Sequence, residues 1–119
     1  MTAVQSPQAA AQRAGDAPKW PAIELAAFVG LPRPSDEQVR IIEAGLDPVL
    51  VVAGAGSGKT ETMANRVVWL LANEAVAPRE VLGLTFTRQA AGALSRRVMQ
   101  RIAEFRTASG GAGLDPLDR

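Results

Sequence analysis

The chain has 119 residues, a formal net charge of +1 at pH 7, 47% hydrophobic residues and 21% charged residues, as in an ordinary small soluble domain. It contains neither cysteine nor histidine, which excludes disulfides, cysteine nucleophiles, serine–histidine triads and metal sites built from these side chains. No apolar run approaches the roughly 20 residues of a membrane span, and the N-terminus lacks a secretory signal pattern. We therefore expect no membrane partner and a cytoplasmic location.

Both ends of the chain are predicted to be flexible. Residues 1–19 are rich in Ala, Gln and Pro and offer little apolar surface to bury, so they predict a disordered leader. Residues 20–33 predict a short helix that stops at Gly30, followed by a proline-rich linker. Residues 107–119 are rich in glycine and predict a flexible tail. The folded domain is expected over residues 34–106.

A helix is predicted to open this domain at Ser35. The run Ser-Asp-Glu-Gln at residues 35–38 fits a capping box, with Ser35 as the N-cap and Gln38 at the third helical position. Gly45 ends the predicted helix, and Asp47 with Pro48 marks a turn.

The rest of the domain predicts an α/β fold with a parallel sheet and flanking helices. Residues 49–52 and 81–86 are short apolar runs, which are typical of strands buried on both faces of such a sheet. Residues 59–73 and 89–105 carry apolar side chains at helical spacing. A strand, a crossover helix and a second strand predict a right-handed βαβ unit.

A phosphate-binding loop lies between the first predicted strand and the helix after it. Residues 53–60 read Ala-Gly-Ala-Gly-Ser-Gly-Lys-Thr, which resembles the Walker A pattern except for alanine in first position. Glycines let backbone amides approach phosphates closely, and the helix directs its free N–H groups at them. Lys59 can reach the β- and γ-phosphates, and the Thr60 hydroxyl can coordinate Mg²⁺. The predicted phosphate site comprises Ala53, Gly54, Ala55, Gly56, Ser57, Gly58, Lys59 and Thr60. The alternative is an ordinary glycine-rich turn.

Two flanking motifs narrow the interpretation. Gln38 lies about twenty residues before Gly58 and Lys59 at the end of the loop, and a Thr-Phe-Thr-Arg segment follows the loop at residues 85–88. Over residues 31–106 the chain resembles UvrD/Rep/PcrA-type superfamily 1 DNA helicases. The resemblance implies an incomplete RecA-like P-loop NTPase domain that uses ATP and Mg²⁺ and moves along single-stranded DNA in repair or recombination. Lys59 and Thr60 would be its catalytic residues here, with Thr60 as the metal ligand.

The resemblance also assigns individual side chains. It implies that Gln38 recognises adenine, whereas the sequence alone favours a helix-capping role for this residue. Glu61 stands where many members carry an arginine that approaches the nucleotide, so it is counted with the cofactor-binding residues. Residues 58–63 and 66–70 are similar to motor subunits of actinobacterial heterodimeric helicase–nucleases, which implies a second helicase–nuclease subunit as a partner.

Single-stranded DNA is assigned by the same resemblance to Thr85, Phe86, Thr87 and Arg88. Phe86 could stack a base, and the hydroxyls and Arg88 could hold phosphate. The alternative for Phe86 is a core aromatic residue. We interpret Arg96 and Arg97 as a solvated helix face, and Trp20 and Trp69 as packing residues.

Hydrolysis requires acidic residues from a later strand, and after the helix predicted at residues 89–105 the sequence offers no such strand. Asp115 and Asp118 follow no apolar strand, so they do not resemble the Asp-Glu pair of the family. We therefore expect a fragment that is marginally stable, binds nucleotide weakly and does not unwind DNA alone. One alternative is a non-catalytic module that binds nucleotide or single-stranded DNA. Another is a different P-loop enzyme such as a small-molecule kinase, against which the Thr-Phe-Thr-Arg segment argues.

Overall fold

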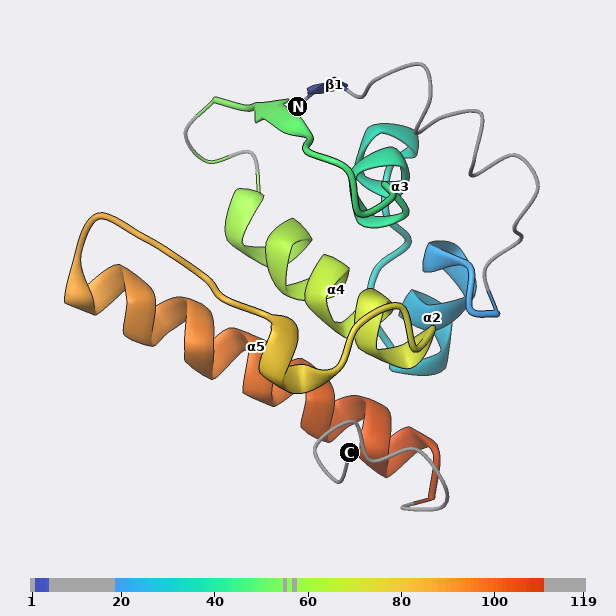
Figure 1. Ribbon diagram of the computed structural model, residues 1–119. Helices are drawn as coiled ribbons and strands as arrows, with labels where there is room; N and C mark the ends of the chain where they lie inside the picture. The colour runs from blue at the N-terminus through green and yellow to red at the C-terminus, as the bar shows by residue number, and fades with distance from the viewer. Residues whose placement is uncertain (1, 5–18, 55, 57, 111–119) are drawn as a thin grey trace.

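The structure, a computed structural model, describes residues 2–4, 19–54, 56 and 58–110. Helix α4 lies between α5 and α3, and the strands lie at one edge of this helical arrangement (Figure 1). The elements are β1 (Thr2–Val4), α2 (Ala22–Phe28), α3 (Asp36–Ile42), β2 (Leu50–Val52), α4 (Lys59–Ala72), the 3₁₀ helix η1 (Pro78–Glu80) and α5 (Arg88–Ala108).

The four predicted α-helices are confirmed close to their expected bounds. The capping box of α3 forms as predicted, because Ser35 accepts from the backbone N–H of Gln38 and the Gln38 side chain accepts from that of Ser35. Gly30, just after α2, adopts a φ of 77°, which is a conformation that glycine enters without steric cost. Helix α5 is longer than predicted at both ends. At its start, Thr87 caps it one residue earlier than expected.

The hydrophobic core sits among α2, α3, α4 and α5. The rings of Trp20, Phe28 and Phe105 meet with centroids 4.8 to 5.8 Å apart, which joins the segment around α2 to α5. Such aromatic clusters contribute beyond the area that they bury. Trp20 and Trp69 are therefore packing residues, as predicted. The buried members of the core are Ala22, Leu25, Ile42, Val68, Trp69, Leu70, Leu71, Ala72, Ile102 and Phe105.

Side chains on or next to α4 form hydrogen bonds with main-chain groups of neighbouring segments. The Arg66 guanidinium donates to the carbonyl oxygens of Ile41, Ile42 and Ala44 at 2.8 to 3.3 Å, and to Gly45 at 3.0 Å. These carbonyls lie at the C-terminal end of α3, where a cation also interacts favourably with the helix dipole. Arg66 therefore fastens α3 to α4 through main-chain atoms.

Asn73, the C-cap of α4, also binds main-chain atoms. Its amide accepts from the backbone N–H of Trp20 at 2.6 Å and donates to the Trp20 carbonyl at 3.1 Å. It also donates to the Trp69 carbonyl at 2.8 Å. The pair of bonds to Trp20 ties the chain before α2 to α4, so this segment is held by polar as well as apolar contacts.

The sheet differs from the prediction. β2 confirms a strand within residues 49–52, but it pairs antiparallel with β1, with Thr2 opposite Val52 and Val4 opposite Leu50. Leu50 and Val52 are exposed, so the expected burial on both faces is wrong. Among the described residues only β1 lies beside β2, and burial on both faces requires further strands and helices that cover them. The described residues therefore contain no parallel sheet.

The second predicted strand, over residues 81–86, does not form. This segment runs without regular structure from η1 to α5, and Leu82 and Leu84 are 82% and 83% exposed. A strand exists only where a neighbour completes its ladder of hydrogen bonds, and no described strand lies beside this one. The predicted βαβ unit is consequently absent from the described part of the chain.

The predicted flexible ends need partial correction. Thr2–Val4 form β1 within the expected leader, and Thr107 and Ala108 belong to α5 rather than to the expected tail. Pairing with β2 orders the first segment, and continuation of the helical hydrogen bonds orders the second. The remainder of both predictions, at residues 1, 5–18 and 111–119, lies outside the described residues. Among the helices that the structure describes, none is long and apolar enough to span a membrane.

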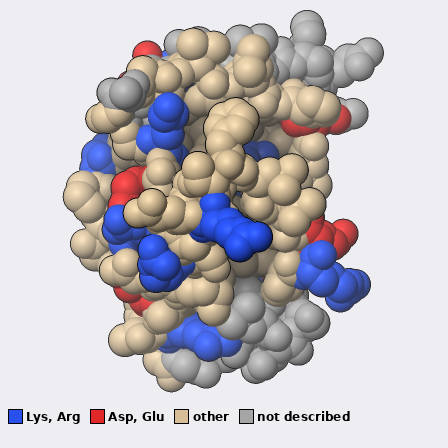
Figure 2. All heavy atoms as spheres, turned by 90° about the vertical axis from the view of Figure 1, so that its left-hand side faces the viewer, with Lys and Arg blue, Asp and Glu red and all other residues tan. Residues whose placement is uncertain are grey.

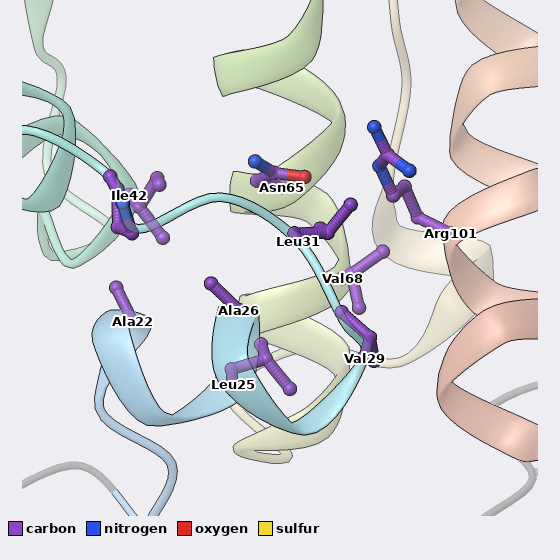
Figure 3. Close-up of a pocket in the computed structure, with 10 residues that line it drawn as sticks. Ala22, Leu25, Ala26, Val29, Leu31, Ile42, Asn65, Val68 and Arg101 are labelled. Carbon is purple, nitrogen blue, oxygen red and sulfur yellow. The ribbon is translucent and has the colours of Figure 1, made fainter. Parts of the chain in front are cut away.

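A small cavity lies inside the core between α2, α4 and α5 (Figure 3). Its volume of ≈ 20 Å³ is room for about one water molecule. Its lining is mostly apolar, with Asn65 and Arg101 as the polar members. None of the lining residues belongs to the predicted nucleotide or DNA site, so this cavity is a packing feature.

Candidate functional site

The predicted phosphate loop connects β2 to α4 and ends in left-handed backbone. Gly56 and Gly58 have φ values of 76° and 81°, and Gly58 is the N-cap of α4. A residue with a Cβ would be strained at either position. Its N-cap, Gly58, has no side chain and so makes no side-chain cap bond to α4, whereas many helices begin at a polar residue that does. The predicted contacts of Ala55 and Ser57 lie outside the described residues.

The first turn of α4 presents its polar groups to solvent. Lys59 and Thr60 are exposed, while Thr62 is buried and donates its hydroxyl to the Gly58 carbonyl at 3.0 Å. Thr62 thus anchors the end of the loop, a role that the sequence analysis missed although its spacing of four residues from Gly58 suits a helix. The uncapped N–H groups and the positive end of the helix dipole suit an anion such as phosphate.

Gln38 lies beside the loop, although twenty residues separate it from Gly58 in the sequence. Its Oε1 accepts from the Ser35 N–H at 2.9 Å, which is the capping role. Its Nε2 lies 3.8 Å from the point where a Cβ on Gly58 would stand. The structure therefore brings the predicted adenine-binding residue to the phosphate loop, with the amide oxygen engaged by the helix cap.

Glu61 forms ion pairs with α5. Its carboxylate accepts from Arg97 at 2.8 Å and from Arg101, which also pairs with Glu104 at 2.9 Å. Burial opposes the charged form of Arg101, but hydrogen bonds to Glu61 and Glu104 outweigh it and raise the pKa of Arg101 above its ordinary value. The interpretation of Arg97 as part of a solvated face is thus incomplete. The spacing of four residues between Arg97 and Arg101 was the sequence signal, because it places both on one helix face.

The predicted DNA-binding segment leads into α5 and is exposed throughout. Phe86 is fully exposed, so the alternative of a core aromatic is wrong. The Thr87 hydroxyl oxygen accepts from the Ala90 N–H at 3.0 Å and caps α5. The Thr85 hydroxyl donates to the Thr87 carbonyl at 2.9 Å. Both hydroxyls therefore have local structural roles, while Phe86 and Arg88 present their side chains to solvent.

The face that carries the start of α5 is shown in Figure 2. Lys and Arg side chains are spread over this face from its left side to its right edge, including its centre, and Asp and Glu lie mostly toward its edges. An apolar groove of ≈ 270 Å³ lies between α4 and the first half of α5. Its lining residues are Val67, Val81, Gly83, Ala91, Leu94, Ser95, Val98 and Met99. Ser95 is the polar member of this lining, so the walls of the groove are mainly apolar.

Comparison with known proteins identifies a family for this chain. Residues 35–112 match the family model described as the UvrD/REP helicase N-terminal domain. The ATP-dependent DNA helicase UvrD2 of Mycobacterium tuberculosis is 42% identical over 82 residues, which cover 69% of this chain and 12% of that protein. The ATP-dependent DNA helicase PcrA of Staphylococcus aureus is 38% identical over 68 residues, 57% of this chain and 9% of that protein. DNA helicase II of Haemophilus influenzae is 37% identical over 70 residues, 59% and 10% respectively.

Proposed function

The chain belongs to the family of UvrD/REP helicase N-terminal domains, and we propose that it is the ATP-binding segment of an ATP-dependent DNA helicase that moves along single-stranded DNA in repair or recombination. One observation carries the proposal: α4 starts without a side-chain cap at left-handed Gly58, with Lys59 and Thr60 exposed beside it. The chain spans about a tenth of the length of the relatives that it matches, from 9% to 12%. The proposal therefore concerns a larger protein.

Phosphate binding follows from the donors at the start of α4. The N–H groups of the first helical turn have no intrahelical acceptor, and they point where an anion is most favourable. Lys59 adds a full positive charge, which gives the charge-assisted hydrogen bonds that hold phosphate oxygens. The glycines at positions 54 and 56 have open space where a Cβ would stand, so the loop leaves room for a ligand to approach the backbone.

Mg²⁺ fits this site as a companion of the nucleotide. The described residues contain no group of three or more acidic side chains that could hold a metal. Mg²⁺ usually keeps several waters and is held by a few protein oxygens together with phosphate oxygens. We propose that Thr60 supplies the hydroxyl oxygen, and that the phosphates supply the remaining charge.

Adenine recognition is proposed for Gln38. Its Nε2 lies beside Gly58, and an amide that donates and accepts can bind the adenine edge in two places. The cap occupies one lone pair of Oε1 and leaves the donors of Nε2. Gln38 would thus serve α3 and the base at the same time.

Single-stranded DNA is proposed to bind at residues 85–88. The Phe86 ring is fully exposed on the surface, and stacking on an aromatic ring suits every base. Arg88 is exposed at the start of α5, where it can pair with a DNA phosphate. A second helicase–nuclease subunit also stays a proposal, based on the sequence around the loop alone.

Nucleotide binding by the purified chain tests the proposal. We expect a fluorescent ATP analogue with Mg²⁺ to bind, and Lys59→Ala to weaken binding by about tenfold or more, the effect of losing a charge-assisted hydrogen bond. Lys19→Ala is the matched control, because Lys19 is the other lysine of the chain and is exposed outside the site. Equal loss in both variants, or none in either, would contradict the proposed site.

Hydrolysis by the chain alone is not expected. The acidic residue nearest the loop in sequence, Glu61, is held by two arginines of α5 and is not placed to orient an attacking water. Release of phosphate from ATP should therefore stay at background while binding is measurable. Robust turnover would contradict this expectation. Binding without turnover also in a longer version of the protein would favour the non-catalytic module.

A further inference from the structure

Glu61 places a negative charge next to the proposed phosphate site. It is the third residue of α4, in the same turn as Lys59 and Thr60. A carboxylate there interacts favourably with the helix dipole, but so does a bound phosphate, and the two like charges repel each other. An unpaired Glu61 would therefore weaken the binding of a triphosphate.

Two arginines of α5 neutralise this charge. Arg97 donates to one carboxylate oxygen of Glu61 at 2.8 Å, and Arg101 donates to the other. The two side chains differ in burial, since 41% of Arg97 is exposed but only 11% of Arg101. Figure 3 shows Arg101 extending from α5 at the edge of the core cavity. Both oxygens of Glu61 are thus engaged by a neighbouring helix.

We propose that Arg97 and Arg101 are positioning residues of the nucleotide site, which hold the Glu61 carboxylate on α5 and cancel its charge toward a bound triphosphate. The inference rests on the proposed function of the loop. Arg101 also pairs with Glu104, so it has a structural role in addition. Arg97 pairs with Glu61 at a half-exposed position, so its replacement tests the electrostatic role with little effect on folding.

The test measures binding of fluorescent ATP and ADP analogues with Mg²⁺ to the whole chain and four variants. Arg97→Gln should weaken ATP binding about two- to fivefold, the size expected for one partly screened charge near the ligand. The loss should be smaller for ADP, which carries less negative charge.

Arg97→Lys keeps the charge and should bind like the original chain. Glu61→Gln combined with Arg97→Gln should restore the affinity, because the repelling charge is gone. Arg96→Gln, next to it on α5 and exposed, is the control.

The outcomes separate the inference from the proposed function. If the original chain does not bind ATP, both are overturned. If it binds and Arg97→Gln binds equally well, the inference alone is overturned. An equal loss for ATP and ADP that Glu61→Gln does not restore would show that Arg97 acts through the fold, and would overturn it too. Thermal unfolding without nucleotide, measured for each variant, identifies that case.

Discussion

The helical core and the segments that carry the proposed chemistry are built in opposite ways. The core is closed by apolar contacts and by side chains that bind main-chain atoms, such as Arg66 and Asn73. The described residues of 53–60 and residues 85–88 are largely exposed, and the hydrogen bonds of Gly58, Thr85 and Thr87 join residues close to each other in the sequence. From this difference we expect stability and the proposed binding to reside in separate residues of this chain. Substitutions should therefore change one property without the other.

Two phenylalanines provide the sharpest test of this separation. Phe105 is 1% exposed and touches the rings of Trp20 and Phe28, whereas Phe86 is fully exposed. We expect Phe105→Ala to lower the free energy of unfolding by about 3–5 kcal/mol, through lost burial and a cavity. Phe86→Ala should change it by less than about 0.5 kcal/mol. Urea denaturation followed by circular dichroism measures both.

Binding should show the reverse order. Phe86→Ala should weaken the binding of a fluorescent oligo-dT strand about tenfold, the effect of losing one stacked base. The comparison requires that the original chain and Phe86→Ala are equally folded. If Phe105→Ala left the free energy of unfolding unchanged, the expected role of the core in stability would be contradicted. Unchanged DNA binding by Phe86→Ala would remove Phe86 from the proposed DNA site.

Arg66 sharpens the comparison, since it is a charged, partly buried residue that joins α3 to α4 through main-chain atoms. Arg66→Met keeps much of the aliphatic stem but removes the donors to the carbonyls at the end of α3. We expect a loss of about 2–3 kcal/mol, because partly buried carbonyl groups lose their partners. Chemical denaturation measures it, with Arg96→Gln as the control that should be neutral. Nucleotide affinity of the folded Arg66→Met protein should be unchanged, and a large loss there would mean that α3 and the loop are coupled.

Sequence patterns predicted the features that depend on neighbouring residues. The capping box at Ser35, the glycine-rich connection to Lys59 and the apolar spacing of α4 and α5 all act within a few residues of each other. The loop could be predicted as a phosphate site for the same reason, because the Walker A pattern is a short run of small residues before a helix.

Features that depend on distant partners were missed or mistaken. Residues 81–86 have the composition of a strand, but a strand requires a neighbour, and the described residues provide none. Arg66 could not be assigned, because the carbonyls that it binds lie more than twenty residues away. The pairing of Glu61 with two arginines of α5 was not anticipated, while its expected place among the cofactor-binding residues stays a prediction. The sequence shows which residues are present, but it does not show which of them lie close together in the fold.

Gln38 belongs to the helix cap of α3 and also lies beside the predicted phosphate loop, so it links the two regions. Its role is tested by the smallest of the effects that we expect. Ser35→Ala removes the hydroxyl that caps α3 and should cost about 1 kcal/mol of stability, with no change in the preference for ATP over GTP. Gln38→Ala removes the return bond to the Ser35 N–H, at a similar or smaller cost because that bond is exposed. If the Nε2 beside Gly58 also binds adenine, Gln38→Ala should in addition lower the preference for ATP over GTP about fivefold. Competition of ATP and GTP against one fluorescent nucleotide measures this ratio for folded protein of each variant. A ratio that stays the same in both variants would leave Gln38 with the capping role alone, and base recognition would have to come from elsewhere in the protein.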